Sequence, residues 1–269
     1  MNTKLLTDRA LAVIEQYSNF HIGSGTTLSG ICSVPYFNNR RAGLRAGLRA
    51  LKGKGSPHDI YEEAEITALK EKIVPSSFTG AALKEFMVDH RLGIDCSGLV
   101  YYVLNAESIG RSKGQIDRHL SFPYCKKGII GKIVCRIRPT ENTNVQTFAS
   151  DKNSSVVTLA DIQPGDFISM IKHPDASEED RARDHIILIH QIEYQNFIPT
   201  AIHYTHSIAW PTDGVYGHGI RQGVINITDP KKALLEQRWV EAGKTGEENF
   251  TFTRAKKSIT EIRRLNWFV

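Results

Sequence analysis

The chain has 269 residues, of which 41% are hydrophobic and 23% are charged, a composition typical of a folded globular protein. Its net charge of +5 is too small for a dedicated nucleic-acid binder, so we expect no nucleic-acid partner. No apolar run is long enough to span a bilayer, and the first 20 residues lack the apolar core of a secretory signal. We therefore expect a cytoplasmic protein with no membrane partner.

In the N-terminal third, apolar residues recur at helical spacing. They predict an amphipathic helix over 4–18. Ser56 followed by Pro57 is typical of a helix start, and the residues up to about 73 suit a helix. A further helix is predicted over 80–90, burying Leu83, Phe86 and Met87.

A basic segment lies between the first two of these helices, over residues 40–54. It contains the four-residue unit Ala-Gly-Leu-Arg twice, and its cations fall on one stripe if it is helical: Arg41, Arg45, Arg49 and Lys52. Such a stripe is either an anion-binding face or a solvated helix surface, and we favour the solvated surface.

The second half of the chain changes character. Segments rich in β-branched and aromatic residues alternate with short turns, which predicts consecutive antiparallel strands. Helices followed by strands indicate an α+β fold, with N-terminal helices packed on a mostly antiparallel sheet. The predicted strands are 167–172, 185–192, 201–207 and 219–227, with a further one over 132–137.

Four cysteines occur without a C-x-x-C pair, so no zinc ribbon or thioredoxin motif is indicated and a reducing compartment fits best. Cys32, Cys125 and Cys135 are expected to be buried thiols without a partner. Cys96 differs, because Asp95 before it is a suitable helix N-cap and an apolar run follows it. The first turn of a helix favours a thiolate, although a buried inert cysteine is the alternative.

Histidines mark the predicted strands. A strand that starts at His185 is otherwise aliphatic, and the turn Pro164-Gly165 leads into the strand before it. On the next strand, His203 and His206 are three residues apart and must face opposite ways. Only one of them can lie beside His185.

Taken in order, Asp95-Cys96-Ser97-Gly98, Pro164-Gly165-Asp166, His185 and His206-Ser207 resemble the NlpC-type family of cell-wall endopeptidases, which are papain-like cysteine peptidases. The resemblance covers roughly 91–207, and its first motif is the most specific. It implies a papain-like fold, Cys96 as nucleophile, His185 as general base and His206, preferred over His203, as the third catalytic residue.

The implied chemistry is acyl transfer from an amide to Cys96, with hydrolysis by water. The Cys96 backbone N–H would face the oxyanion, and the resemblance suggests Tyr36 as a further donor. Asp95 and Ser97 flank the nucleophile and are expected at the substrate. A Gly- and aromatic-rich loop adds candidate substrate contacts, or is a structural hairpin: Trp210, Tyr216, His218 and Arg221.

The chain departs from the family in its spacing, since 185 − 96 gives 89 positions between nucleophile and base. We expect an N-terminal helical extension over 1–90 and a catalytic core over 91–269 with an insertion at about 108–158, all in one continuous domain. These departures leave the substrate open. A peptide or amide derived from the cell wall is the expected class, and no cofactor is expected.

Three alternatives remain. A papain-like fold also hosts acyltransferases and transamidases, which use the same Cys/His pair. A metal site is a second alternative, but no H-E-x-x-H motif occurs. A non-catalytic binding protein, for instance one that binds RNA through residues 40–54, is the third. The candidate metal ligands are Cys125, His173, His185, His190, His203 and His206.

Overall fold

The structure is a computed structural model that describes residues 2–39, 48–123, 125, 129–174 and 184–268. The chain forms two compact units, each built from segments distant in the sequence. The first unit comprises Met1–Leu11, Leu104–His206 and Gln222–Val269, and the second comprises Ala12–Val103 and Ser207–Arg221. The expected division at residue 90 does not coincide with these units, because residues 207–221 belong to the same unit as Ala12–Val103.

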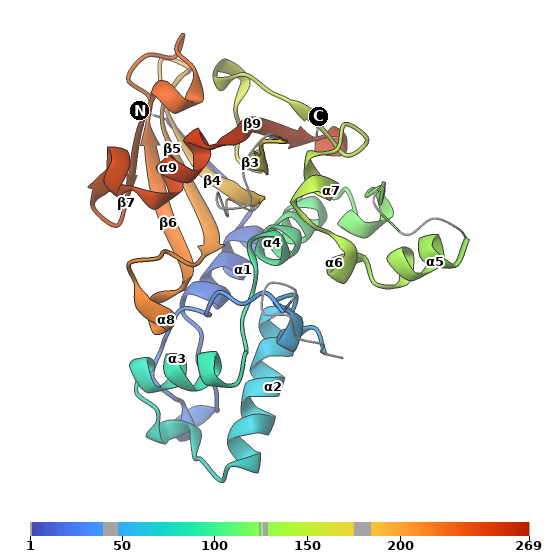
Figure 1. The fold of residues 1–269 in the computed structure, drawn as a ribbon, viewed down its shortest axis with the longest axis vertical. Helices are drawn as coiled ribbons and strands as arrows, with labels where there is room; N and C mark the ends of the chain where they lie inside the picture. Colours follow the sequence, from blue (N-terminus) through green and yellow to red (C-terminus); the bar gives the residue numbers. More distant parts are fainter. Residues whose placement is uncertain (1, 40–47, 124, 126–128, 175–183, 269) are drawn as a thin grey trace. The chain divides into compact units, whose positions relative to one another are not determined.

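The described strands form one nine-stranded sheet, most of which belongs to the first unit (Figure 1). Its order is β2-β9-β3-β4-β5-β6-β7-β8, and β1 also pairs with β4. The neighbours whose register is defined pair antiparallel, as expected. The strands are β1 (Asn2–Leu5), β2 (Ser154–Val156), β3 (Phe167–Lys172), β4 (His185–Gln195), β5 (Ile198–Ile208), β6 (Gly219–Asn226), β7 (Arg238–Glu241), β8 (Lys244–Thr245) and β9 (Ser258–Leu265).

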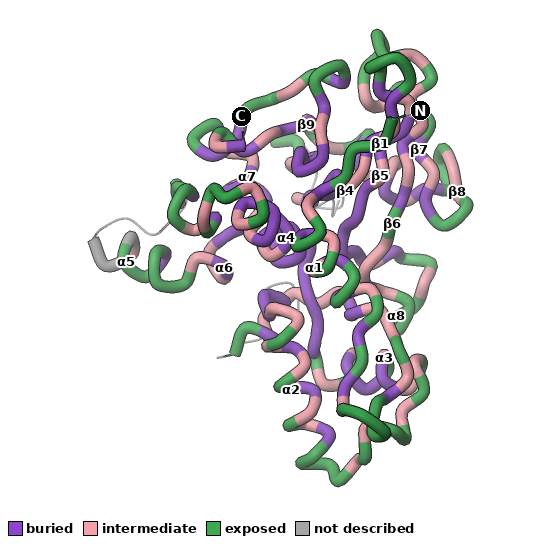
Figure 2. The backbone as a smooth tube through the Cα atoms, turned by 180° about the vertical axis from the view of Figure 1, so that it is seen from behind, coloured by how far each residue is buried: buried purple, intermediate pink, exposed green. Residues whose placement is uncertain are grey.

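The middle strands β4 and β5 are largely buried, and the edge strand β1 is exposed (Figure 2). Their β-branched residues suit a pleated surface covered on both faces. A core cluster on one face joins Ile187, Ile189 and Ile202 with Trp239 of β7. The register of β4 and β5 shifts between Ile189 and Gln191, where a bulge interrupts the alternation.

The sheet unit also holds α5 (Ile129–Ile137), α6 (Pro139–Asn142), α7 (Val145–Ala149) and α9 (Phe250–Lys256). The expected strand at 132–137 is wrong, because these residues lie in α5. The β-branched content of the segment favoured a strand, but Ile133 and Ile137 are four apart, which is helical spacing. Helix α7 contacts β3, and α9 contacts β9.

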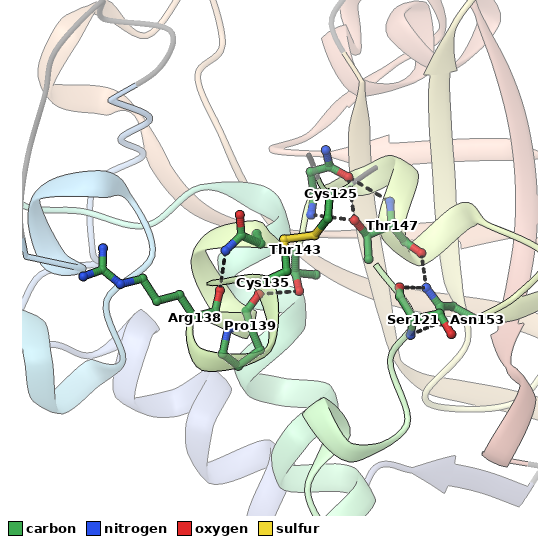
Figure 3. Close-up of a disulfide and its surroundings, with 10 residues drawn as sticks. Ser121, Cys125, Cys135, Arg138, Pro139, Thr143, Thr147 and Asn153 are labelled. Atoms are coloured by element: carbon green, nitrogen blue, oxygen red, sulfur yellow. Dashed lines mark hydrogen bonds between the residues drawn. A yellow bond between two sulfur atoms is a disulfide. The ribbon is translucent and has the colours of Figure 1, made fainter. Parts of the chain in front are cut away.

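A disulfide corrects a second expectation: Cys125 and Cys135 are bonded to each other rather than being separate thiols (Figure 3). Nearby, the side-chain nitrogen of Asn153 donates to the Ser121 carbonyl at 2.8 Å and to the Thr147 carbonyl at 2.7 Å (Figure 3). These hydrogen bonds tie the segment before the disulfide to α7. Cys32 is half-buried and, like Cys96, lies outside any disulfide in the described chain.

The second unit contains α2 (Pro57–Lys70), α3 (Gly80–Asp89) and α8 (Gly214–Gly217), with most of α1 (Asp8–Ser18) and the start of α4 (Cys96–Gly110). The two helices expected at 57–73 and 80–90 are confirmed. Ser56 Oγ accepts the Asp59 N–H at 3.0 Å, and Asp59 Oδ2 accepts the Ser56 N–H at 2.8 Å. The two hydrogen bonds make a capping box. The predicted buried residues of α3 are buried as expected: Leu83, Phe86 and Met87.

The first helix is shorter than expected, and the basic repeat is mostly outside the described residues. The helix expected over 4–18 begins at Asp8, because the residues before it form β1. Residues 40–47, which carry most of the basic repeat, lie outside the described residues. Short helical turns complete the described chain: Gly25–Thr27, Ala50–Lys52, Pro75–Ser77, Ile116–Arg118, Leu159–Asp161, Leu234–Glu236, Gly246–Glu248 and Asn266–Phe268. None of the described helices combines the length and apolar character needed to cross a membrane.

Candidate functional site

Cys96 is the first residue of helix α4, as the sequence predicts, and it is 7% exposed. Asp95 caps the helix: its Oδ1 accepts the Gly98 N–H at 2.6 Å, and its carbonyl accepts the Leu99 N–H at 3.0 Å. The remaining N–H groups of the first turn and the helix dipole favour negative charge at this end. The fold of the second unit therefore places the thiol where a thiolate is stabilised.

Ile94 and Asp95, the two residues before Cys96, are held by three segments of the second unit. Ile94 donates its N–H to the Pro35 carbonyl at 3.0 Å, and its own carbonyl accepts the Ser207 hydroxyl at 2.7 Å. Asp95 donates its N–H to the Gly53 carbonyl at 2.9 Å. Tyr36, the predicted oxyanion donor, forms a parallel bridge with Ile94. Tyr36 thus belongs to the backbone frame that positions the start of α4.

Gly98 has a packing role at the start of α4. A Cβ at this position would lie 2.8 Å from the Gly53 carbonyl oxygen and 2.7 Å from Ile94 Cδ1. Gly53 itself has a φ of 74°, a conformation that favours glycine. The two glycines allow α4 to begin directly against the 53–55 turn.

A buried ion pair adjoins Cys96, the candidate nucleophile, and was not expected from the sequence. Lys54 Nζ lies 2.9 Å from Asp95 Oδ1 and 2.6 Å from Ser97 Oγ, and all three residues are buried. Asn38 Nδ2 donates to the other Asp95 oxygen at 3.0 Å. Asp95 and Ser97, expected at the substrate, are thus engaged in a buried network with Lys54.

The first unit contains a second buried network, centred on two histidines of adjacent strands. His185 opens β4 and His206 lies near the end of β5, and His185 Nε2 is 2.8 Å from His206 Nδ1. On the far side of His206, its Nε2 lies 3.1 Å from Glu241 Oε1 of β7. Tyr204 donates its hydroxyl to the other Glu241 oxygen at 2.7 Å. All four side chains are buried.

The charges in this network have identifiable causes. Burial raises the pKa of the Glu241 carboxyl, but the charge of His206 and hydrogen bonds from His206, Tyr204 and Thr251 together hold it below its usual 4.5. Burial holds the pKa of His185 well below 6.5, and Arg254 and His206 add to this effect. The network therefore combines a carboxylate with a neutral His185.

Glu241 places one proton in this network. A carboxylate only accepts, so His206 Nε2 carries the proton that faces Glu241. When His206 carries this proton alone, its Nδ1 accepts from His185 Nε2–H and His185 Nδ1 is unprotonated. When His206 is an imidazolium, its Nδ1–H donates to His185 Nε2 and the proton of His185 lies on Nδ1. A bare Nδ1 is the form that a general base requires.

The two histidines of β5 that the sequence singled out have different partners. His206 lies beside His185, whereas His203 pairs with Glu193 at 2.8 Å. His190 Nδ1 lies 2.9 Å from the Thr205 hydroxyl, and burial, helped by His203, lowers the pKa of His190 to about 4. Within the residues that the structure describes, no group of three or more His, Cys, Asp or Glu side chains is arranged to hold a metal ion.

The predicted loop contacts lie in the second unit, which also contains Cys96. Trp210 is buried beneath the guanidinium of Arg221, at 4.4 Å from its ring centroid. His218 Nε2 donates to the Trp210 carbonyl at 3.1 Å, and Arg221 also pairs with Asp213. Tyr216 is exposed and donates to Asp89 at 3.1 Å. Trp210 thus supports the loop, while Tyr216 presents part of its ring to solvent.

The sequence interpretation missed the charged residues Glu241 and Lys54, and also Tyr204 and Asn38 beside them. In β7, Trp239 and Glu241 share the buried face and Val240 between them is less buried, so an acid at an inward position was an available signal. Lys54 follows Gly53 in a turn and carried no comparable mark. Cys96 belongs to the second unit and His185 with His206 to the first.

Comparison of the chain with protein-family models, with curated proteins and with solved structures returns no match.

Proposed function

We propose that this chain is a papain-like cysteine hydrolase related to the NlpC-type family, in which Cys96 is the nucleophile and His185 the general base. The observation that carries the proposal is the Glu241–His206–His185 network, which leaves His185 Nδ1 bare when His206 is neutral. The position of Cys96 at the start of α4 supports it. The helix start supplies the thiolate and the network supplies the imidazole of the proposed pair.

In the proposed reaction, His185 Nδ1 takes the Cys96 thiol proton and the thiolate attacks an amide carbonyl. The oxyanion faces the Cys96 backbone N–H, with Tyr36 as a further donor. Collapse of the tetrahedral intermediate breaks the C–N bond, and the His185 imidazolium returns its proton to the leaving amine. Water, deprotonated by His185, then attacks the thioester and releases the acid and the thiol.

The network behind His185 has a role in each proton transfer. When His185 becomes an imidazolium, its Nε2–H still donates to His206, and the buried Glu241 carboxylate compensates the new charge through His206. Arg254 opposes this charge, because its positive field lowers the pKa of His185. A base held neutral at rest and supported once charged can both accept and release a proton.

The deciding experiment is alkylation by iodoacetamide across pH, read by mass spectrometry at each cysteine. We expect Cys96 to react with an apparent pKa below the ordinary thiol value of about 8.5. Cys32 is an internal control, since burial raises the pKa of its thiol to about 11 despite Lys84. At pH 7, Cys96 should therefore react at least about 100-fold faster than Cys32.

The control variant is His185→Ala, in which the apparent pKa of Cys96 should rise and the preference over Cys32 should shrink. The matched variant His203→Ala removes a neighbouring histidine that pairs with Glu193, and it should leave the profile unchanged. An identical Cys96 profile in the wild type and in His185→Ala would refute the proposed pair.

The substrate that we propose is a peptide or amide, with cell-wall-derived peptides as the first class to assay.

The compartment is a separate proposal. The sequence favours the cytoplasm, but a Cys125–Cys135 disulfide is typical of oxidising compartments. Alkylation of the protein, unfolded without reductant, tests whether the disulfide has formed: Cys125 and Cys135 stay unmodified only if they are bonded.

A further inference from the structure

The buried pair formed by Lys54 and Asp95 places charge directly beside the proposed nucleophile. Asp95 is 3% exposed and directly precedes Cys96 in the chain. Its carboxylate therefore lies within a few ångströms of the Cys96 backbone. A buried carboxylate disfavours a second negative charge near it. Taken alone, Asp95 would therefore oppose the thiolate that the helix start favours.

Lys54 offsets this charge. Its ammonium contacts Asp95 Oδ1 at 2.9 Å and is itself 8% exposed, so solvent screens the pair only weakly. The same ammonium donates to Ser97 Oγ at 2.6 Å, and Ser97 in turn donates to Asp95 Oδ1 at 3.1 Å. One cation is thus bonded to the residue before Cys96 and to the residue after it.

The other charged and titratable groups around this cluster come from three helices. Tyr17 of α1 donates to the Gly55 carbonyl at 2.9 Å, and Tyr102 of α4 donates to the Lys54 carbonyl at 2.9 Å. Burial raises the pKa of Tyr17 well above 10, and the charges of Tyr102, Asp59 and Asp95 add to the effect. The charge of Asp95 therefore raises the pKa of a tyrosine of α1. Lys54 is a cation bonded to Asp95.

We propose that Lys54 is a positioning residue for the proposed reaction: it neutralises Asp95 and clamps the first turn of α4, so that Cys96 ionises at neutral pH. The inference rests on the proposed function for its purpose, but the charge effect is a property of the second unit alone. Lys54 acts through Asp95 and Ser97 and needs no contact with a substrate.

The test is a double-substitution cycle of Lys54→Met and Asp95→Asn, read by the pH dependence of Cys96 alkylation. Removing the cation should raise the apparent pKa of Cys96 by about one unit or more, which slows alkylation at pH 7 by about tenfold. Removing the carboxylate should lower the apparent pKa. The double variant, which lacks both charges, should return to within about half a unit of the wild type.

Opposite shifts distinguish electrostatics from damage to the fold, because loss of structure would move both single variants the same way. Thermal unfolding of each variant measures that damage separately. If Lys54→Met does not fold, Asp95→Asn decides, since it keeps the shape of the cap. A Cys96 profile for Asp95→Asn that coincides with the wild type, or single-variant shifts of the same sign, would overturn the proposal.

The same cycle in a His185→Ala background separates this inference from the proposed function. The shifts caused by Lys54 and Asp95 should persist there, because neither depends on the histidine. If His185→Ala alone leaves Cys96 unchanged while the cycle still shows opposite shifts, the proposed base is wrong and the role of Lys54 in thiol ionisation stands.

Discussion

Glu241 fixes one proton of His206 and through it acts on His185, which it never touches. Its carboxylate holds the proton on His206 Nε2, and a neutral His206 in turn accepts the proton of His185 Nε2. Tyr204 donates to the same carboxylate, and burial raises the pKa of its phenol well above 10, so it remains a donor. We expect the neutral form of His206 at neutral pH, which leaves His185 Nδ1 bare.

The substitution Glu241→Gln tests this assignment. An amide both donates and accepts, so His206 can take either tautomer, and we expect a mixture of protonation states in His206 and His185. The measurement is the nitrogen-15 chemical shifts of the imidazole nitrogens. In the wild type, His185 Nδ1 should show the shift of an unprotonated nitrogen at neutral pH.

A rate measurement and a control variant accompany the measurement of chemical shifts. The rate of any hydrolysis that depends on Cys96 should fall by roughly 10- to 100-fold in Glu241→Gln, as for other residues that orient a catalytic histidine. Glu193→Gln is the matched control, because it changes the partner of His203 alone. Protonated Nδ1 on His185 in the wild type would contradict the assignment.

Helix α4 begins against the 53–55 turn because Gly98 has no side chain on that side. The packing of α4 is set within one helical turn of Cys96, where the cap, the glycine and the Ser97 hydroxyl all face the 53–55 turn. A helix whose interior contains glycine loses about 1 kcal/mol of propensity relative to alanine. The close approach offsets that loss.

Gly98→Ala should therefore destabilise the protein in spite of its better helix propensity. The new Cβ would meet the Gly53 carbonyl oxygen, which is backbone and cannot move aside freely. We expect the free energy of unfolding to fall by about 1–3 kcal/mol. Urea denaturation measures the change.

Lys70→Ala, at an exposed position near the end of α2, is the control for that experiment and should change stability by less than about 0.5 kcal/mol. A Gly98→Ala variant as stable as the wild type would show that the 53–55 turn yields to the helix.

Across the whole molecule, buried histidines link folding to pH. Burial and the neighbouring charges of Arg254 and His206 hold the pKa of His185 well below 6.5, and burial lowers that of His190 to about 4. In the unfolded chain both rings titrate near 6.5. Below that pH the unfolded state binds more protons than the folded state, so the folded state loses stability as pH falls.

We accordingly expect the free energy of unfolding to decrease continuously between about pH 6.5 and pH 4. His190 alone accounts for up to about 3 kcal/mol of this decrease if its pKa shift is fully expressed. His190→Asn keeps an acceptor for the Thr205 hydroxyl and removes the titration, so its pH dependence should be shallower. Urea denaturation at several pH values is the measurement, and parallel curves for the two proteins would count against it.

Local features were readable from the sequence. The start of α4 at Cys96, the helix start at Ser56-Pro57 and the strand that opens at His185 all follow from residue spacing and caps within a few positions. Spacing also showed that His203 and His206 face opposite ways. It misplaced the segment 132–137, where β-branched residues outweighed helical spacing.

The tertiary structure alone decided which distant residues meet. Strand register placed Glu241 behind His206, 35 positions earlier, and the fold of a turn brought Lys54 to Asp95, 41 positions later. The pairing of Cys125 with Cys135 likewise joins residues 10 positions apart that carried no motif. Caps and periodicity act within one or two turns of chain, whereas such contacts depend on how elements pack, and no local pattern encodes that.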